Sequence, residues 1–220
     1  MFDSEAVRLR EILLAQANAS PLLNLGSSTR EFREVTQPHI YSELFGPLNE
    51  AGVTVIHSDL KQADGVDRAG DILDPAVMSD LKSRGFRCVL ISNLLEHVRN
   101  RDAVAAACEE IVGPGGLILA TVPSSFPFHA DPIDTHYRPS PPELTALFKR
   151  CHVLLNEELI VRTYREDWKT RGSTGWKELA KTLGWSLIFF ARPKSFVSRA
   201  HRWLWYSRPY RVSIALLSVL

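Results

Sequence analysis

Apolar and polar positions divide most of the chain into short hydrophobic runs that alternate with amphipathic segments. The runs are rich in Leu, Val and Ile, which is typical of strands buried on both faces. They cover residues 22–25, 53–57, 86–92 and 117–122, and a more polar short strand is predicted within 65–73. The amphipathic segments, which predict helices, cover residues 4–17, 40–48, 75–84 and 101–112. This alternation favours a doubly wound α/β fold with a mostly parallel sheet.

Capping residues mark where several of the predicted helices begin. Ser4, Asp74 and Asn100 each precede an amphipathic segment, and their side chains suit the N-cap position. Ser140 is followed by two prolines and Glu143, which predicts a capping box at the start of one more short helix.

The last quarter of the chain has a different composition. Residues 161–220 contain 12 Lys and Arg against 3 Asp and Glu, together with all five tryptophans, whereas residues 1–160 contain 14 against 22. Two further strands are predicted at 151–161 and 210–220, which brings the sheet to seven strands. We therefore divide the chain into a core at 1–160, a basic aromatic insertion or lid at 161–208 and a closing strand of the core at 209–220.

The basic, Trp-rich insertion suits a partner that is anionic and partly apolar. One interpretation is peripheral contact with membrane headgroups, and the other is that the aromatic side chains pack as a lid over the substrate. Nucleic acid is the weakest candidate partner, because the acidic core would repel it.

The chain shows the features of a cytoplasmic protein. Its first residues lack the basic and then apolar pattern of a signal peptide, and no apolar stretch has the length of a membrane span. The three cysteines, Cys88, Cys108 and Cys151, are widely spaced, which indicates reduced thiols and not a zinc site.

Small and polar residues follow the predicted strands where a ligand of a parallel sheet would bind. Gly26 and Ser27 come after the first strand, Asp59 after the second, Asp71 after the third and Asn93 after the fourth. Because the carboxyl ends of parallel strands lie at one edge of a sheet, these residues are expected to meet in one cleft. Asp59 has enough acceptor sites for both hydroxyls of a ribose. Each acid also has a simpler interpretation as a turn or cap residue.

Several motifs in this order resemble those of class I S-adenosylmethionine-dependent methyltransferases of the LEHV type. The resemblance covers residues 22 to about 148 and rests on LLNLGSST, Asp59, GDI at 70–72, LLEHV at 94–98 and GPGGLILATVP at 113–123. It implies S-adenosylmethionine as the cofactor. The implied contacts are Asn24, Gly26 and Ser27 along the methionine part, Asp59 with the neighbouring Leu60 at the ribose, Asp71 and Ile72 at the adenine, and Asn93 and Leu94 beneath the sulfonium.

Three positions depart from the pattern of that family. Asn24 stands where an acidic residue is usual, Ser28 where a second glycine is common and Arg87 where Asp is frequent. These departures motivate an alternative function, a non-catalytic cofactor-binding or scaffolding protein with a degenerate methyltransferase fold.

The long loop at 123–139 carries the candidate catalytic residues. Loops of this length inside a compact domain are more often functional than idle. His129 is the candidate base that takes a proton from the acceptor, and Asp131 or Asp134 would orient its imidazole or bind substrate hydroxyls. The alternative is that His129 and Asp134 only fix the loop through backbone hydrogen bonds. We expect Glu96 and His97 to form a satisfied structural pair.

A metal-dependent variant has less support. Some O-methyltransferases are similar in carrying a Glu-x-x-Glu-His ligand set, of which Glu96, His97 and His129 could remain here, with Asn93 in place of the first Glu. No metal is therefore predicted. The favoured function is methyl transfer from S-adenosylmethionine to oxygen or nitrogen of a small molecule, sugar or lipid-linked glycan. A nicotinamide oxidoreductase is disfavoured because no G-x-G-x-x-G follows the first strand.

Overall fold

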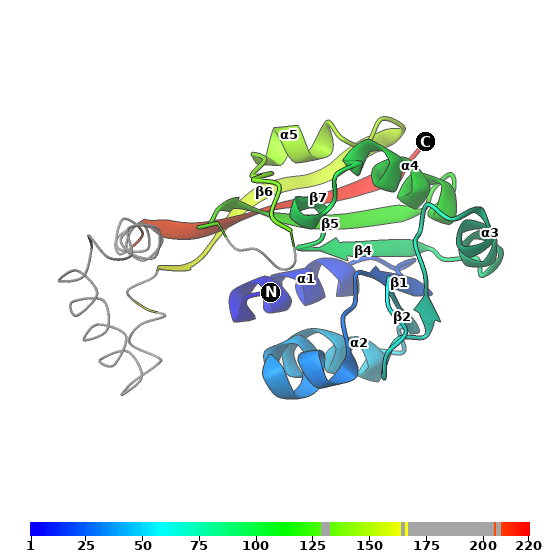
Figure 1. Ribbon diagram of the computed structural model, residues 1–220, viewed down its shortest axis with the longest axis horizontal. Coiled ribbons are helices and arrows are strands. Elements are labelled where there is room, and N and C mark those ends of the chain that lie inside the picture. Colours follow the sequence, from blue (N-terminus) through cyan, green and yellow to red (C-terminus); the bar gives the residue numbers. More distant parts are fainter. Residues whose placement is uncertain (129–132, 164–165, 167–204, 206–207) are drawn as a thin grey trace, which may run out of the picture.

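A mixed β-sheet forms the centre of the molecule (Figure 1). The computed structural model describes residues 1–128, 133–163, 166, 205 and 208–220. These residues form a seven-stranded sheet with the order β3-β2-β1-β4-β5-β7-β6. The strands are β1 (Leu22–Leu25), β2 (Val55–Asp59), β3 (Arg68–Ala69), β4 (Cys88–Ser92), β5 (Leu117–Ser125), β6 (Cys151–Thr163) and β7 (Pro209–Val219).

The first five strands are parallel and the last two reverse direction. β1 pairs in parallel with both β2 and β4, β2 with β3, and β4 with β5. β7 pairs antiparallel with β5 on one side and with β6 on the other. The predicted doubly wound, mostly parallel sheet of seven strands is therefore confirmed.

Helices cover both faces of the sheet, as Figure 1 shows. One face carries α1 (Asp3–Leu14), the helical turn η2 (Tyr41–Phe45) and α2 (Gly46–Glu50), which form one apolar cluster with Leu22 of β1 and Cys88 and Leu90 of β4. The other carries α3 (Pro75–Ser83), α4 (Arg101–Val112) and α5 (Pro141–Thr145), packed on Leu23, Val89 and Ile91. Two shorter turns are η1 (Phe32–Thr36) and η3 (Leu95–His97).

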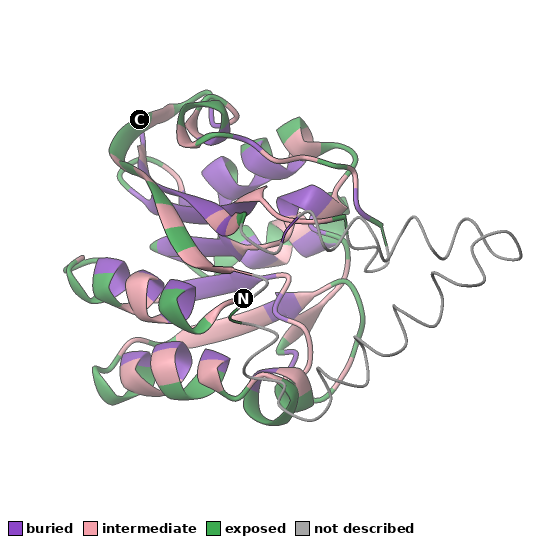
Figure 2. Ribbon diagram, turned by 90° about the vertical axis from the view of Figure 1, so that its left-hand side faces the viewer, coloured by how far each residue is buried: buried purple, intermediate pink, exposed green. Residues whose placement is uncertain are grey.

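The central strands read as continuous apolar runs because successive side chains enter opposite layers. Cys88 and Leu90 lie in the layer of α1, whereas Val89 and Ile91 lie in the layer of α4, and all four are fully buried. Figure 2 shows burial along these strands and on the helix faces turned toward them.

Most of the predicted helix starts are confirmed. Asp74 accepts hydrogen bonds from the amides of Ala76 and Val77, and Asn100 accepts one from Ala103. The carboxylate of Glu143 accepts from the amide and the hydroxyl of Ser140, at 2.8 and 2.7 Å, which completes the capping box.

Two elements differ from the prediction. Helix α1 begins at Asp3 with Phe2 as its cap, not Ser4, because the carboxylate of Glu5 accepts the amide of Phe2 at 3.1 Å. The helix ends at Leu14, three residues short of the predicted end. The third strand is only two residues long, since the Asp71 side chain accepts the amide of Leu73 and turns the chain away from the sheet.

The insertion predicted at 161–208 lies almost wholly outside the described residues. Within the part of the chain that is described, no helix combines the length and the hydropathy that crossing a membrane requires.

Candidate functional site

A turn after β1 joins three strand ends at the carboxyl edge of the sheet. Leu25 is paired with Ser58 of β2, and Ser58 with Arg68 of β3, so the parallel strands end close to one another. The amides of Gly26 and Ser27 both donate to the carbonyl of Ser58, at 2.8 and 3.0 Å. The amide of Gly70 in turn donates to the carbonyl of Asp59 at 3.0 Å. Backbone hydrogen bonds therefore hold the three turns to one another.

Gly26 fits this turn because it has no side chain. Its φ of +75° is a left-handed conformation that residues with a Cβ rarely adopt. A Cβ at this position would lie 3.0 Å from Cδ1 of Leu94, which follows β4. Any larger residue would fill the space between the turn after β1 and the turn after β4.

Asp59 lies at the tip of β2 and holds the turn after β1 with one oxygen. Its Oδ2 accepts the amide of Ser28 at 2.8 Å, while Oδ1 is 3.4 Å from the amide of Lys61. The next residue, Leu60, is 66% exposed, which is unusual for a leucine that follows a strand. Thus a carboxylate and an exposed apolar side chain lie next to each other at this strand end.

The residues after β3 lie beside this strand end. Asp71 is exposed and its Oδ1 accepts the amide of Leu73 at 2.9 Å, whereas Ile72 is buried in the core layer of α3. The side chain of Asp71 therefore acts as a turn residue and is exposed to solvent.

Arg33 is a buried cation beneath the turn after β1. Its guanidinium donates to the carbonyls of Ser27 at 2.9 Å, Ser28 at 2.7 Å and Gly65 at 2.8 Å. Burial lowers its pKa below the ordinary value. Sequence reasoning gave this residue no role, because a charged side chain in an amphipathic segment is usually solvated. One guanidinium here fixes the backbone of two loops.

Asn24 is turned toward the neighbouring strand. Its Nδ2 lies 3.0 Å from Nδ1 of His57, its register partner on β2. Burial, with a smaller effect of the charge of Arg33, lowers the pKa of His57 to about 4, so the imidazole is neutral and Nδ1 accepts the amide hydrogen. This contact gives a physical reason for an amide at position 24, where an acidic residue is usual in the family that the sequence resembles. A carboxylate has no hydrogen to donate to Nδ1 of His57.

Asn93 leaves β4 in a strained conformation that a side chain from α1 supports. Its φ is +51°, and its amide donates to the carbonyl of Thr121 at 3.0 Å. Its Nδ2 donates to Oε1 of Glu5 at 2.8 Å, and the same oxygen accepts the hydroxyl of Thr121 at 2.7 Å. Glu5 is fully buried. The sequence predicted Glu5 to lie on a helix that only covers the sheet. Its position along the chain did not indicate a role at the strand ends.

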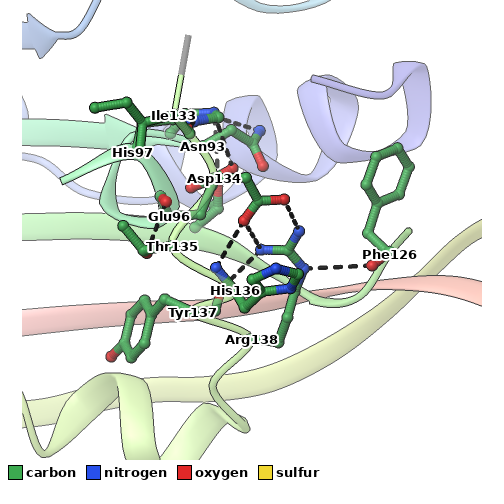
Figure 3. Close-up of polar contacts among 12 residues, drawn as sticks. Asn93, Glu96, His97, Phe126, Ile133, Asp134, Thr135, His136, Tyr137 and Arg138 are labelled. Atoms are coloured by element: carbon green, nitrogen blue, oxygen red, sulfur yellow. Dashed lines mark hydrogen bonds and ion pairs between the residues drawn. The ribbon is translucent and has the colours of Figure 1, made fainter. Parts of the chain in front are cut away.

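The loop after β5 is fixed by an ion pair. Nη2 of Arg138 lies 2.6 Å from Oδ2 of Asp134, and the side chain of Asp134 is fully buried (Figure 3). Oδ1 of Asp134 also accepts the amide of His136 at 2.8 Å. Asp134 therefore holds the loop. His129 and Asp131, the other two candidate catalytic residues, lie outside the described residues.

The same loop is bound to the segment that follows β4. The amide and the hydroxyl of Thr135 both donate to the carbonyl of Glu96, at 2.9 and 2.8 Å (Figure 3). Nδ1 of His97 contacts the carbonyl of Ile133, and the guanidinium of Arg101 lies 4.4 Å from the centre of the Tyr137 ring. The LEHV segment and residues 133–138 thus form one unit at the end of β4.

Glu96 differs from the satisfied structural pair that the sequence predicts. The residue is fully buried, and neither carboxylate oxygen has a hydrogen-bond partner. Nε2 of His97 is 3.8 Å from Oε1, beyond hydrogen-bonding distance. Burial raises the pKa of Glu96 to about 7. A titratable group whose pKa is perturbed in this way at a strand end is a candidate functional residue. The sequence motifs did not indicate this role for Glu96.

Among the described residues, no group of three or more His, Cys, Asp or Glu side chains is arranged to hold a metal ion. Of the ligand set considered from the sequence, Asn93 binds Glu5, and Glu96 and His97 are the remaining described members.

The whole chain is similar in structure to solved methyltransferases. One is a coclaurine N-methyltransferase bound to N-methylheliamine and SAH, with a TM-score of 0.50, 10% identity and coverage of 98% of this chain and 70% of that chain. Another is a putative sarcosine dimethylglycine methyltransferase from Galdieria sulphuraria, with a TM-score of 0.50, 14% identity and coverage of 98% and 83%. A third, described by the conversion of a disulfide bond into a thioacetal group during echinomycin biosynthesis, has a TM-score of 0.54, 14% identity and coverage of 98% and 81%. No family model matches the chain, and no curated protein matches its sequence.

These likenesses define the class of fold. The chain has the fold of class I S-adenosylmethionine-dependent methyltransferases, as the motifs in the sequence predicted. Its sheet ends in the reversed pair β7 and β6.

Proposed function

We propose that this protein binds S-adenosylmethionine and transfers its methyl group to a small-molecule acceptor. The observation that carries the proposal is the linked set of turns at the ends of β1, β2 and β3, in which Gly26, having no Cβ, lets the turn after β1 approach Leu94 closely. A nucleoside at this edge would meet a carboxylate and an exposed apolar side chain within one small region.

Each part of the cofactor has a chemically suitable neighbour in this proposal. Gly26 and Ser27 border the methionine part, the Oδ1 atom of Asp59 accepts from the ribose, and Leu60 covers one side of the nucleoside. Asp71 and Ile72 lie at the adenine, and Asn93 and Leu94 lie beneath the sulfonium. The side chain of Asn24 already contacts His57 of β2. Asn24 therefore affects the cofactor site indirectly, by holding strand β1.

The bound cofactor would supply an activated methyl group for an in-line displacement. The protein then has to hold the acceptor opposite the sulfur and receive a proton. We propose His129 as the base, with Asp131 orienting it. Asp134 acts by positioning, since its ion pair with Arg138 fixes the loop that carries both.

The acceptor is proposed to be a small molecule, a sugar or a lipid-linked glycan. Neighbours of similar fold include a coclaurine N-methyltransferase and a protein of echinomycin biosynthesis, which supports a small acceptor in general. The cytoplasm is the proposed location. Peripheral contact of the basic, Trp-rich segment with a membrane is also a proposal, tested by flotation with anionic and with neutral liposomes in low and high salt.

Calorimetry tests the cofactor. We expect S-adenosylhomocysteine to bind the purified protein, and Asp59→Ala to weaken that binding, with Asp64→Ala as an exposed control on the following loop. Absence of binding in the wild-type protein would reject the proposed function.

A second candidate function is cofactor binding without catalysis. It is favoured by Ser28, which adopts a φ of +55° where the family commonly has glycine. Formation of S-adenosylhomocysteine from S-adenosylmethionine in the presence of an acceptor would reject this candidate.

A further inference from the structure

Glu96, in the segment after β4, has a buried carboxylate that makes no hydrogen bond. The side chain of Glu96 is 1% exposed and its two oxygens make no hydrogen bond. A buried carboxylate without partners is costly, because it loses its hydration and gains nothing in return. Such a group is either protonated or completed by a ligand with hydrogens to donate.

The charged groups around Glu96 do not complete it. Arg138 lies near enough to influence it, but its guanidinium makes the 2.6 Å ion pair with Asp134. His97 is at 3.8 Å and directs Nδ1 to the carbonyl of Ile133. Figure 3 shows the ion pair of Arg138 with Asp134.

A second buried carboxylate increases the negative charge of this region. Glu5 lies near enough to act on the titration of Glu96. Among the described residues, the hydrogen-bond donors to Glu5 are uncharged: the amide of Phe2, the side chain of Asn93 and the hydroxyls of Ser92 and Thr121. Hydrogen bonds of this kind stabilise an anion but do not neutralise it. Two buried carboxyl groups, those of Glu5 and Glu96, therefore lie at the end of β4, where Asn93 is proposed to lie beneath the sulfonium.

We propose that Glu96 binds the protonated amine of the methyl acceptor, and that Glu5 adds to the field that favours a cation there. The inference rests on the proposed function and specifies its substrate class. An ammonium group has several hydrogens and a full positive charge, so it can donate to both oxygens of Glu96 and also compensate its charge. A hydroxyl has a single hydrogen and no charge, so it would leave the region anionic.

For an amine acceptor the proton acceptor is Glu96, whereas His129 is the proposed base for a hydroxyl acceptor, and the chemistry balances. One N–H proton of the ammonium passes to the carboxylate, which leaves a neutral amine with a lone pair. A new N–C bond then forms as the C–S bond breaks, sulfur keeps that electron pair, and the product is an N-methylammonium and a neutral thioether. A carboxyl with a pKa of about 7 is suited to exchange this proton near neutral pH.

The test compares ammonium probes with neutral probes of the same shape. The protein is saturated with S-adenosylhomocysteine and titrated at pH 8 with benzylammonium or benzyl alcohol, n-propylammonium or n-propanol, and glucosamine or glucose. We expect at least one ammonium probe to bind tenfold or more tightly than its neutral counterpart. Glu96→Gln should remove this difference, Glu5→Gln should reduce it, and the exposed control Glu110→Gln on α4 should retain it.

The outcomes separate the two proposals. Failure of S-adenosylhomocysteine to bind rejects the proposed function. Binding of S-adenosylhomocysteine without preference for any ammonium probe in the wild-type protein overturns the amine inference alone, and this comparison does not depend on the folding of a variant. A preference that persists in Glu96→Gln overturns it as well.

Discussion

Asp59 and Ser28 are joined by a hydrogen bond of 2.8 Å between a carboxylate oxygen and a backbone amide. The bond connects the tip of β2 to the turn after β1. It also orients Ser28, whose backbone is left-handed with a φ of +55°. Asp59 therefore has two functions in our proposal, because Oδ2 fixes the turn and Oδ1 is directed to the ribose.

This double function makes the two substitutions of Asp59 distinguishable. Asp59→Ala removes both oxygens, so we expect a loss of stability of about 1–2 kcal/mol together with at least a tenfold loss of affinity for S-adenosylhomocysteine. Asp59→Asn keeps an oxygen for Ser28 and should retain most of the stability while losing affinity. Urea unfolding and calorimetry measure the two effects. If both variants lose stability and affinity in parallel, the carboxylate is structural.

Arg33 provides a second test of the turn, independent of the cofactor. Its planar guanidinium donates to three carbonyls of two loops. A lysine ammonium cannot reach all three positions in the same plane. We expect Arg33→Lys to lower the free energy of unfolding by about 1–3 kcal/mol, the cost of leaving buried carbonyls unpaired. The matched control is Arg30→Lys, an exposed residue paired with Asp64 at 3.3 Å, for which we expect about 0.5 kcal/mol or less. Equal effects in urea unfolding would contradict the anchoring role of Arg33.

His57 predicts how stability depends on pH. Its pKa in the folded protein is lowered from 6.5 to about 4. The unfolded chain therefore binds the proton more tightly, and the contribution of His57 is present above pH 6.5 and is lost as the pH falls toward 4. Relative to His57→Gln, the wild-type protein should lose about 2–3 kcal/mol of stability over this range. Unfolding curves of both proteins at pH 7, 5.5 and 4.5 measure the difference. A constant difference would mean that burial does not hold the imidazole neutral in the folded protein.

The sequence predicted the fold well because most elements of the fold depend on local patterns of apolar and capping residues. Runs such as 88–91 are apolar throughout because the strand is buried on both faces, and Asp74 and Asn100 cap helices through contacts two or three residues away. The short β3 was overestimated because the turn at Asp71 depends on one side-chain contact and not on the apolar pattern.

The site was less predictable because its important contacts join distant segments. Glu5 and Asn93 are 88 residues apart, and Arg33 and Gly65 are 32 apart, so no spacing in the sequence connects either pair. Glu96 is next to His97 in the sequence, yet its carboxylate is not satisfied by it, because the side chains lie 3.8 Å apart and His97 contacts Ile133. The two side chains are within ion-pair distance, but no hydrogen bond forms between them.

Glu5 supports the proposed cofactor site although it is far from Asn93 in the sequence. The effect of its side chain can be separated from the effect of helix α1. The carboxylate accepts the side chain of Asn93 at 2.8 Å and the hydroxyl of Thr121 at 2.7 Å, and its other oxygen accepts the amide of Phe2 at 3.1 Å. Glu5→Ala leaves these buried donors unpaired, so we expect a loss of stability of about 2–4 kcal/mol.

The informative variant is therefore Glu5→Gln, in which one amide oxygen replaces two carboxylate oxygens. If the oxygen keeps the cap at Phe2, the amide group meets the side chain of Asn93, whose Nδ2 has no acceptor there. We expect the left-handed turn at Asn93 to relax and the affinity for S-adenosylhomocysteine to fall by about tenfold, the equivalent of roughly one lost hydrogen bond. Glu11→Gln, an exposed change on the same helix, should leave the affinity unchanged. An unchanged affinity in Glu5→Gln, with α1 still folded by circular dichroism, would show that Asn93 keeps its conformation without the carboxylate.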